Sequence, residues 1–302
     1  MTMETADLML RPGIMAGQNI LITGGGSGLG RAMAETFLML GARVHICGRR
    51  QGVLDAAAAE LSRRTGGSII PHGCDIRDDL AVEAMLDTIW AGSGPLTGLV
   101  NNAAGNFISR TEDLSMRGFD AITNIVFRGA FGITHNCGRR WIAGGDRASV
   151  LSIVATWVWN GSPYTVPSAM AKSGINAMVQ SLAVEWGGKG IRLNAIAPGP
   201  FPTEGVRKRL RPGMSEDEAD RDAGADNPMG RVGRLPEFTN LAAFLMSPGS
   251  DYINGQTIAI DGGRHLATGG NFSSLRSWSD ADWENARQSI RATDSMDKSR
   301  RG

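Results

Sequence analysis

The stretch NILITGGGSGLGRAMAETFLMLGA, residues 19–42, places an apolar run, a glycine-rich turn and a helical pattern in immediate succession. The run NILIT predicts a buried strand, and the segment from about Gly28 to Leu40 predicts a helix. Gly24 can turn tightly, Gly28 lets the backbone approach a pyrophosphate, and Gly30 lets the helix pack closely on the sheet. Because the helix N-terminus then faces phosphates, this order predicts a dinucleotide site. The residues expected to line the turn are Gly24, Gly25, Gly26, Ser27, Gly28, Leu29 and Gly30.

The rest of the chain repeats the pattern of a short apolar run followed by a helical segment. Such alternation is typical of a parallel sheet that is buried on both faces, with helices as the crossovers. The sequence therefore predicts an α/β fold with a Rossmann-like, doubly wound parallel sheet. The runs are NILIT, RVHIC, LTGLV, SVLSIV, IRLNAI and TIAI, which begin at Asn19, Arg43, Leu96, Ser149, Ile191 and Thr257.

No break in composition and no linker rich in proline or serine interrupts the chain before about residue 264. We therefore expect a single domain over residues 16–264, with an N-terminal extension over residues 1–15 and a C-terminal extension over residues 265–302.

Two polar segments carry further expectations. Residues 211–228 are strongly charged, which predicts either a mobile loop over a site or a solvated helix and loop. In the C-terminal extension, a helix capped near Ser279 is expected beside Trp278 and Trp283. Two tryptophans on a polar tail suggest that the tail docks, either on a neighbouring subunit or over the substrate.

The composition excludes several classes of protein. A chain of 302 residues with 42% hydrophobic content can bury a sizeable core. Lys plus Arg number 31 against 30 for Asp plus Glu, so the formal charge of +1 gives no field that would favour nucleic acid. No segment reaches the roughly 18 apolar residues of a membrane span. We therefore expect neither nucleic-acid nor membrane partners.

The cysteines and histidines indicate neither a disulfide framework nor a metal site. The three cysteines show no CxxC spacing, and the four histidines lie far apart without ligand spacing. The N-terminus carries Glu4 and Asp7 and has no sustained apolar run, unlike a secretory signal. We predict a cytoplasmic protein without a metal. The residues concerned are Cys47, Cys74, Cys137, His45, His72, His135 and His265.

The residues after the second strand bear on the choice between NAD and NADP. An acidic side chain usually accepts the ribose hydroxyls of NAD there, but this sequence reads ICGRR. The guanidinium groups of Arg49 and Arg50 suit a 2′-phosphate, so we predict NADPH; the alternative is that they only cover the surface. Asp75, after the third strand, is predicted either to accept from the adenine amino group or to cap a helix.

Several motifs together resemble the short-chain dehydrogenase/reductase family: TGGGSGLG, NNAAG at residues 101–105, Lys172 on a predicted helix, and PGP at residues 198–200. The resemblance covers about residues 15–264. Longer motifs, NNAAGNFIS, VPSAMAKSGINAMVQSLAVEWG and RLNAIAPGP, are similar to the 2,4-dienoyl-CoA reductases. After the last of these follow Thr203, Gly205 and Arg209. The resemblance implies an NADP-binding reductase domain that reduces a 2,4-dienoyl-CoA to an enoyl-CoA with NADPH, in fatty acid oxidation.

The same resemblance implies roles for individual residues. Lys172 would bridge the nicotinamide ribose and lend positive potential, Asn124 would position a water, and Ser168 would lie one helical turn before the lysine. The cofactor residues implied beyond the glycine turn and Lys172 are Arg49, Arg50, Asp75, Asn102, Pro198, Gly199, Pro200 and Phe201. The acyl-CoA residues implied are Arg77, Asn106, Phe107, Ser115 and Arg209, with Arg49, Arg77 and Arg209 jointly gripping the CoA phosphates.

The sequence departs from the family at the residue that should donate a proton. The general Tyr-x-x-x-Lys pattern requires tyrosine at position 168, where Ser168 stands. The dienoyl reductases place a tyrosine fifteen residues before the lysine, where this chain has Trp157. An indole N–H can donate a hydrogen bond but cannot release a proton. Our hypothesis is that Trp157 and Asn106 form an oxyanion hole and water delivers the proton. The alternatives are Tyr164 as the acid, or Trp157 as a packing residue of an acyl tunnel.

Three functions remain open from the sequence. The first is the NADPH-dependent reduction of an unsaturated acyl-CoA. The second keeps the fold and the cofactor but acts on another enone, ketone or thioester. The third is a catalytically inactive NADP-binding sensor, which the missing tyrosine suggests. The family also implies a homo-oligomer, a dimer or homotetramer, that packs the helices before and around Lys172.

Overall fold

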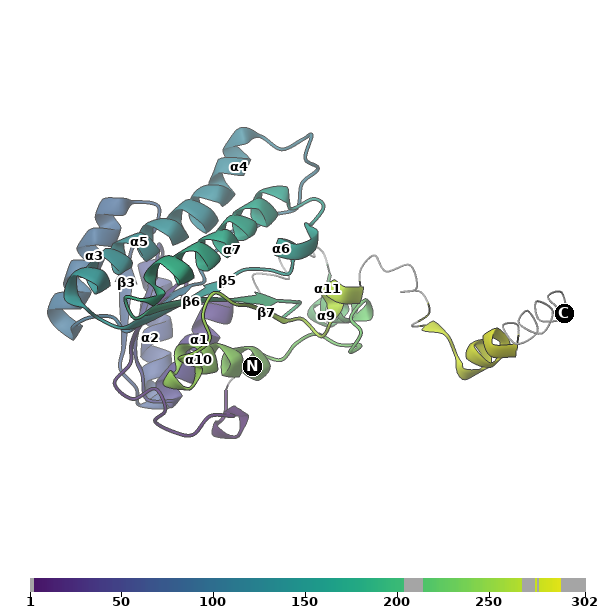
Figure 1. Cartoon of the computed structure of the whole chain (residues 1–302), viewed down its shortest axis with the longest axis horizontal. Helices are drawn as coiled ribbons and strands as arrows, with labels where there is room; N and C mark the ends of the chain where they lie inside the picture. The colour runs from purple at the N-terminus through teal and green to yellow at the C-terminus, as the bar shows by residue number, and fades with distance from the viewer. Residues whose placement is uncertain (1–2, 204–213, 268–274, 276, 289–302) are drawn as a thin grey trace.

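The computed structural model describes residues 3–203, 214–267, 275 and 277–288. A seven-stranded parallel sheet in the order β3-β2-β1-β4-β5-β6-β7 forms its centre (Figure 1). The order reverses between β1 and β4, which is the point where doubly wound sheets open a crevice for a ligand. The strands are β1 (Asn19–Thr23), β2 (Arg43–Gly48), β3 (Ile69–Gly73), β4 (Gly98–Asn101), β5 (Ala148–Ile153), β6 (Ile191–Pro198) and β7 (Thr257–Ile260).

Helices cover both faces of this sheet. On one face lie α3, α5 and α7, and on the other α1, α2 and α10 (Figure 1). A π-helical segment, η2, joins α4 to α5. The helices are α1 (Gly28–Met39), α2 (Gln51–Thr65), α3 (Asp79–Ser93), α4 (Met116–Thr123), η2 (Asn124–Gly129), α5 (Ala130–Gly144), α6 (Trp157–Asn160), α7 (Val166–Gly187), α9 (Glu216–Ala225), α10 (Leu235–Met246) and α11 (Arg264–Ala267), with short 3₁₀ turns η1 (Thr5–Asp7) and η3 (Pro248–Ser250).

Each face of the sheet has its own hydrophobic core. Along β1, the side chain of Leu21 enters the core under α3, α5 and α7, while Ile20 and Ile22 enter the core under α1, α2 and α10. This alternation follows from the two-residue period of a strand. A strand with both faces covered must be apolar throughout, and all five residues of β1 are buried.

The predicted α/β class and single doubly wound sheet are confirmed. Each of the six apolar runs overlaps one strand of the sheet. The strand expected before Asp75 is β3. It does not form an apolar run in the sequence, because it contains Pro71, His72 and Gly73. Proline is tolerated here because β3 is an edge strand, where fewer backbone N–H groups are needed for pairing.

The sequence predicts that residues 211–228 form either a mobile loop over a site or a solvated helix and loop. The structure shows a helix, α9, over Glu216–Ala225, and residues 211–213 lie outside the described residues. Ser215 accepts a hydrogen bond from the Glu218 N–H at 3.4 Å, and the Glu218 carboxylate accepts one from the Ser215 N–H at 2.9 Å. This capping box and the acidic first turn satisfy the N–H groups and dipole of the helix N-terminus.

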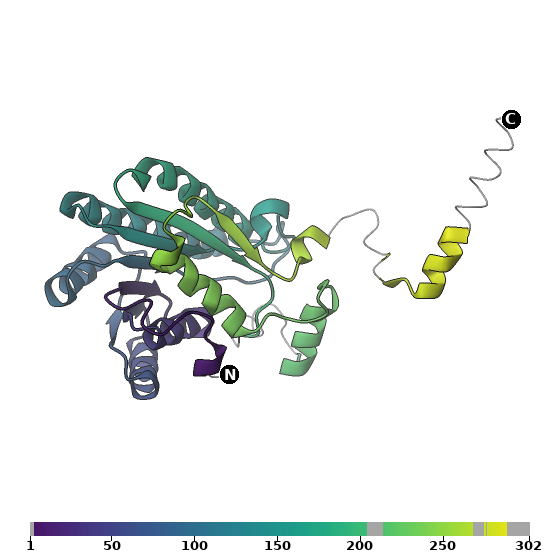
Figure 2. The same cartoon turned by 60° about the horizontal axis from the view of Figure 1, so that its bottom comes forward.

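The N-terminal extension packs on the domain beside α10 (Figure 2). The Asn240 side chain donates to the Asp7 carbonyl at 2.7 Å and accepts from the Met9 N–H at 2.9 Å. Arg64 donates to the carbonyl of buried Met3 and forms an ion pair with buried Glu35 at 2.9 Å. Burial raises the pKa of Glu35, so the nearby guanidinium is needed to hold its charge.

The helix expected in the C-terminal extension is present over residues 280–288. Ser279 caps it, with Ser279 and Asp282 exchanging hydrogen bonds. The rings of Trp278 and Trp283 pack edge to face on each other, 5.0 Å apart. Figures 1 and 2 show this helix away from the sheet, and neither tryptophan is among the residues that line the large cleft described below.

Two histidines that are distant in sequence meet in the sheet. His45 on β2 and His72 on β3 share a hydrogen bond of 2.8 Å, and the side-chain oxygen of Asn19 accepts a hydrogen bond from Nε2 of His45 at 3.0 Å. Burial lowers the pKa of His45 to about 4, so the pair is neutral at physiological pH. Across residues 3–203, 214–267, 275 and 277–288, His, Cys, Asp and Glu form no group of three that could hold a metal.

Candidate active site

A large cleft opens at the carboxyl ends of the strands. Its volume is about 1610 Å³, and its walls run from the glycine turn after β1 to the segment after β7. Pockets for one small molecule usually measure about 300–1,000 Å³. The cleft therefore has room for a dinucleotide and a second molecule together.

The glycine turn has the geometry that the sequence predicted. Gly24 and Gly28 have left-handed backbones, with φ of +67° and +55°. A Cβ on Gly30 would lie 2.5 Å from both the Gly24 carbonyl oxygen and the Asn102 side-chain nitrogen. That nitrogen donates to the carbonyls of Thr23 at 2.9 Å and Gly24 at 3.3 Å. The turn therefore lies in close contact with Asn102, directly after β4. Only glycine fits at position 30, because any side chain there would overlap these atoms. The residues of the predicted turn that line the cleft are Gly24, Gly26, Ser27, Gly28 and Leu29.

Charged residues line the end of the cleft beside β2 and β3. Arg49 and Arg50 are exposed and line it, as does Asp75. Arg77 clasps the Asp75 carboxylate, its Nε lying 2.9 and 3.0 Å from the two oxygens, and this hydrogen bonding lowers the pKa of Asp75. The expectation that Asp75 caps a helix is wrong, because Asp78 is the N-cap of α3.

Lys172 and Ser168 lie together on α7 and both line the cleft. The ammonium group of Lys172 is buried and donates to the Ile153 carbonyl at the end of β5. Burial lowers the pKa of Lys172 to about 8, because the charged form loses hydration. The side chain of Ser168 is also buried, one turn earlier on the same face.

Trp157 and Asn106 face the same cleft from different segments. Trp157 begins α6 directly after β5 and is half-buried. The side-chain oxygen of Asn106 accepts from the Phe107 N–H at 2.9 Å, and the NH₂ group of the same side chain is a hydrogen-bond donor. Two residues that carry hydrogen-bond donors therefore line the same cleft as Lys172.

Tyr164 is not in a position to serve as the acid. Its side chain is 61% exposed and is not part of the cleft wall, which includes its neighbours Pro163 and Thr165. The backbone explains this, because Tyr164 has a left-handed φ of 63° and its carbonyl accepts from the Ser109 N–H. The chain has two tyrosines, and the other, Tyr252, is fully exposed.

Several predicted residues lie outside the cleft wall. Asn124 begins η2 and is half-buried, but the wall is formed by the next residue, Ile125. Ser115 caps α4 by accepting from the Gly118 N–H, and Phe107 packs near the same turn. Arg77 is engaged with Asp75, and Arg209 lies outside the described residues. Of the predicted acyl-CoA residues that the structure describes, Asn106 is the one that lines the cleft.

The segment after β6 closes the opposite wall. Pro198, Gly199, Pro200 and Phe201 all line the cleft, as predicted for this segment. A Cβ on Gly199 would lie 2.7 Å from the Cα of Asp261. The segment is therefore in close backbone contact with the residue that follows β7. Buried Phe201 packs edge to face on Phe238 with ring centres 5.4 Å apart, which anchors the segment to α10.

The sequence analysis missed residues at the far side of the cleft. Arg264 and His265 line it, although the domain boundary was drawn between them. The Nδ1 of His265 lies 2.8 Å from a carboxylate oxygen of buried Asp261, and its ring stacks on Trp159 with centroids 4.8 Å apart. The spacing of Asp261 and His265, four residues apart just after a strand, was the signal that could have linked them.

The sheet order, the glycine turn and the cleft with its lysine define a dinucleotide-dependent oxidoreductase fold. Residues 24–265 match the family model described as enoyl-(acyl carrier protein) reductase. The chain belongs to the short-chain dehydrogenase/reductase family. Members of this family bind nicotinamide cofactors.

Within the family, the chain is similar to proteins named as 2,4-dienoyl-CoA reductases. It is 41% identical to a probable 2,4-dienoyl-CoA reductase, (3E)-enoyl-CoA-producing, of Caenorhabditis elegans, over 96% of this chain and 94% of that one. It is 38% identical to a probable (2E)-enoyl-CoA-producing reductase of Bacillus subtilis, over 82% and 96%. A crystal structure of a short-chain dehydrogenase from Bacillus anthracis superimposes with a TM-score of 0.73 at 38% identity, covering 82% of this chain and 97% of that one.

Replacement of Gly30 by alanine tests the geometry of the turn. The added Cβ would collide with the Gly24 carbonyl and the Asn102 amide, so we expect Gly30→Ala to weaken NADPH binding by at least about tenfold, or about 1.4 kcal/mol. Titration of NADPH fluorescence measures this. The control is Gly92→Ala, on α3, where a Cβ meets no atom within 4 Å and NADPH binding should not change. Equal binding by both variants would contradict the assigned turn.

Proposed function

We propose that this protein reduces a 2,4-dienoyl-CoA to an enoyl-CoA with NADPH, as a step of fatty acid oxidation. The observation that carries the proposal is a cleft with a buried lysine but no phenol: the two tyrosines, Tyr164 and Tyr252, both lie exposed outside the wall. Reduction of a ketone to an alcohol requires an acid at the oxygen. Reduction of a conjugated thioester requires first a stabilised oxyanion, and carbon can be protonated afterwards.

The donors in the cleft suit such an oxyanion. The indole N–H of Trp157 and the amide of Asn106 can both donate to a thioester oxygen that gains negative charge. The Lys172 ammonium adds positive potential from its buried position, and it carries charge below its pKa of about 8. The Ile153 carbonyl orients the ammonium, and Ser168 completes the polar face of α7.

The residues of the cleft fit NADPH. The glycine turn leaves its Gly28 position open toward the cavity, while Arg49 and Arg50 supply cations where a 2′-phosphate would lie. Bound there, NADPH supplies the hydride. The residues that would hold it are those of the turn, Arg49, Arg50, Asp75, Asn102, Lys172 and Pro198, Gly199, Pro200 and Phe201. Arg77 would hold the Asp75 carboxylate in position through their ion pair. For Arg77 to bind a CoA phosphate, this ion pair would have to break.

Substitution of the paired arginines tests the choice of cofactor. We expect the double variant Arg49→Gln, Arg50→Gln to raise the Kd of NADPH by about thirtyfold to a thousandfold, because each of the two lost charge-assisted contacts contributes about 1–2 kcal/mol. The Kd of NADH, which has no 2′-phosphate, should change by less than threefold. Arg63→Gln on the exposed face of α2 is the control. Equal weakening of both cofactors would mean that the arginines do not read the phosphate.

Turnover with a panel of thioesters tests the reaction itself. NADPH oxidation should be rapid with a 2,4-dienoyl-CoA and slow with a 2-enoyl-CoA or a 3-oxoacyl-CoA. Loss of one oxyanion donor costs about 3 kcal/mol, so Trp157→Phe should lower kcat with the dienoyl-CoA by about a hundredfold. Trp278→Phe, in the C-terminal extension, should leave kcat unchanged.

Other outcomes of this panel select the other functions. Oxidation of NADPH with the 3-oxoacyl-CoA alone would identify a ketone reductase. Tight NADPH binding without oxidation by any thioester would indicate a sensor. An unchanged kcat for Trp157→Phe would show that Trp157 is a packing residue of the cleft and not a hydrogen-bond donor to the oxyanion.

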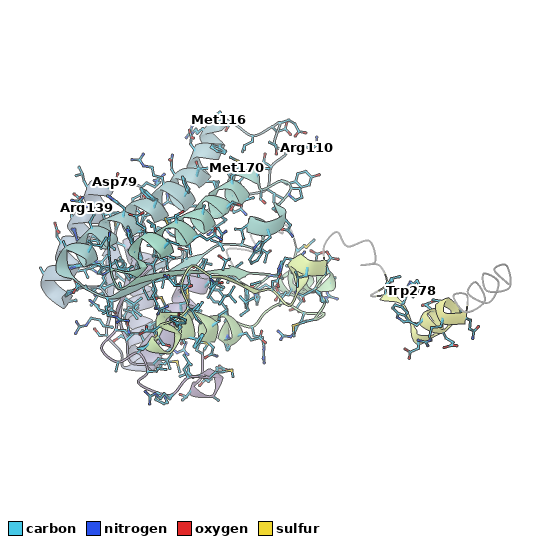
Figure 3. All side chains as sticks on the ribbon, in the orientation of Figure 1. Asp79, Arg110, Met116, Arg139, Met170 and Trp278 are labelled. Atoms are coloured by element: carbon cyan, nitrogen blue, oxygen red, sulfur yellow. The ribbon has the colours of Figure 1, made fainter. Side chains whose placement is uncertain are left out.

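We also propose that the protein is a homo-oligomer, a dimer or tetramer, built on the outer face of α4, η2, α5 and α7. Figure 3 shows Met116 on α4 and Met170 on α7 pointing outward. Such a cluster of exposed apolar side chains is typical of an interface. The exposed apolar residues of this face are Met116, Phe127, Phe131, Ile142, Met170 and Val184.

A charge placed on this face should separate the subunits. Val184 on α7 is 86% exposed, so Val184→Glu should leave the fold intact and lower the mass measured by light scattering. Leu80→Glu, which changes a residue of α3 that is 77% exposed, should keep the mass of the original protein. A monomeric original protein would contradict the proposal.

We place this activity in the cytoplasm. The three cysteines are buried as free thiols, which suits a reducing compartment. In the part of the chain that the structure describes, no helix is long and apolar enough to cross a membrane. Cell fractionation with an antibody to the protein would test the assignment.

A further inference from the structure

An aspartate directly after β7 holds the imidazole of His265 in place. The side chain of Asp261 is almost fully buried, with 3% exposed. Its carboxylate accepts hydrogen bonds from the backbone N–H groups of Gly263 at 2.9 Å and His265 at 2.8 Å, and one of its oxygens lies 2.8 Å from Nδ1 of His265. Because the backbone and the ring of His265 are bound to the same carboxylate, the imidazole is restricted in its orientation.

The imidazole stacks on a tryptophan of α6. The ring of His265 lies 4.8 Å from the ring of Trp159, with an angle of 28° between the planes. Trp159 belongs to α6, which begins at Trp157, and α11, which carries His265, packs on α6. Trp159 is 47% exposed and is not among the residues that line the cleft, whereas Trp157 and His265 both line it. Trp159 therefore acts on the cleft through the neighbours that it contacts.

The helix α6 depends on tertiary contacts for its position. It is a single turn, in which the Gly161 N–H donates to the Trp157 carbonyl at 2.9 Å, and Gly161 ends it with a left-handed φ of 69°. None of the residues of α6 is fully buried. A single helical turn is unstable by itself, because its nucleation is unfavourable. Packing against α7 and against α11 therefore decides where α6, and with it Trp157, lies.

Asp261 also contacts the segment that would cover the nicotinamide. A Cβ on Gly199 would lie 2.7 Å from the Cα of Asp261, and the Gly199 N–H donates to the carbonyl of Ile260, directly before Asp261, at 3.0 Å. The backbone of Asp261 is thus packed on the segment after β6, while its side chain binds His265, which stacks on Trp159. Direct contacts therefore connect the nicotinamide wall of the cleft to α6.

We propose that Asp261, His265 and Trp159 are positioning residues that set the distance between the indole of Trp157 and the nicotinamide. The inference rests on the proposed function, in which Trp157 donates to the thioester oxygen while the nicotinamide delivers hydride. Hydride transfer requires reacting atoms about 3–3.5 Å apart, and a displacement of about 1 Å can lower the rate about a hundredfold. The role depends on the stacked rings and on the contact at Nδ1, and His265 exchanges no proton with the substrate.

The variant Trp159→Ala tests the proposal from outside the cleft wall. With a 2,4-dienoyl-CoA and NADPH, we expect kcat to fall by about tenfold or more, because the reacting groups are misaligned. The KM of the dienoyl-CoA and the Kd of NADPH should change by less than about threefold, since the affected interaction forms in the transition state. Trp159→Phe keeps a ring for the imidazole to stack on, so its kcat should stay within about threefold of the original value.

A double variant tests whether the stacked rings act through Trp157. In the Trp157→Phe background the indole donor is absent, so adding Trp159→Ala should lower kcat by less than about threefold, whereas independent losses would multiply. The matched control is Leu266→Ala, beside His265 on α11, which shortens a side chain that is 77% exposed and should keep full turnover. Multiplication of the two losses, or a kcat of Trp159→Ala equal to that of the original protein, would overturn the positioning role.

Fluorine NMR of protein labelled with fluorotryptophan gives a measurement that does not depend on turnover. The signals of Trp157 and Trp159 are assigned by their loss in the two phenylalanine variants. His265→Ala should shift both signals, and Leu266→Ala should shift neither. An unchanged Trp157 signal in His265→Ala would overturn the positioning role even in an active enzyme. Failure of the original protein to oxidise NADPH with any dienoyl-CoA would instead overturn the proposed function, and with it the role of these residues in setting the reaction distance.

Discussion

The cleft depends on the contact between Asn102 and the first strand. The Asn102 amide donates to the carbonyls of Thr23 and Gly24, while its backbone N–H donates to the Thr23 hydroxyl at 3.0 Å. These bonds join the ends of β1 and β4, the two strands between which the sheet order reverses. Since both strands point their carboxyl ends to the same edge, the glycine turn and the lysine wall are held on opposite sides of one crevice. The missing side chain of Gly30 is what allows this approach.

The other side of the crevice is organised by Asp261. It lies against Gly199, where no Cβ could fit, and its carboxylate holds His265. One buried carboxylate thereby links the segment that would cover the nicotinamide to the segment beside α6. Burial has a further effect at the centre of the site, because desolvation lowers the pKa of Lys172 to about 8 and leaves its charge poised near physiological pH. The segment that would cover the cofactor, the buried lysine and the segment beside α6 are therefore connected by direct packing contacts.

Sequence reasoning predicted the sheet and the glycine turn because both follow from local patterns, apolar runs and glycines at fixed offsets. It did not predict the place of Tyr164, since a left-handed φ in a Gly-Ser-Pro context turns the phenol outward and leaves no periodic signal. It divided the chain between Arg264 and His265 because the composition changes there, whereas the partner of His265 is Asp261 within the domain. The pairing of Arg77 with Asp75 was equally hidden, because each residue was assigned to a different ligand.

The most direct measurement of this account follows the position of deuterium after turnover of a 2,4-dienoyl-CoA with NADPH that carries deuterium at the transferable position. NMR of the product should place the deuterium on carbon 5 of the acyl chain, and in D₂O a second deuterium should appear on the α-carbon. That result would mean that the cleft stabilises an enolate and that carbon is protonated afterwards. Deuterium on a carbinol carbon, or no deuterium in the product, would contradict this account. The cleft would then not stabilise a thioester enolate.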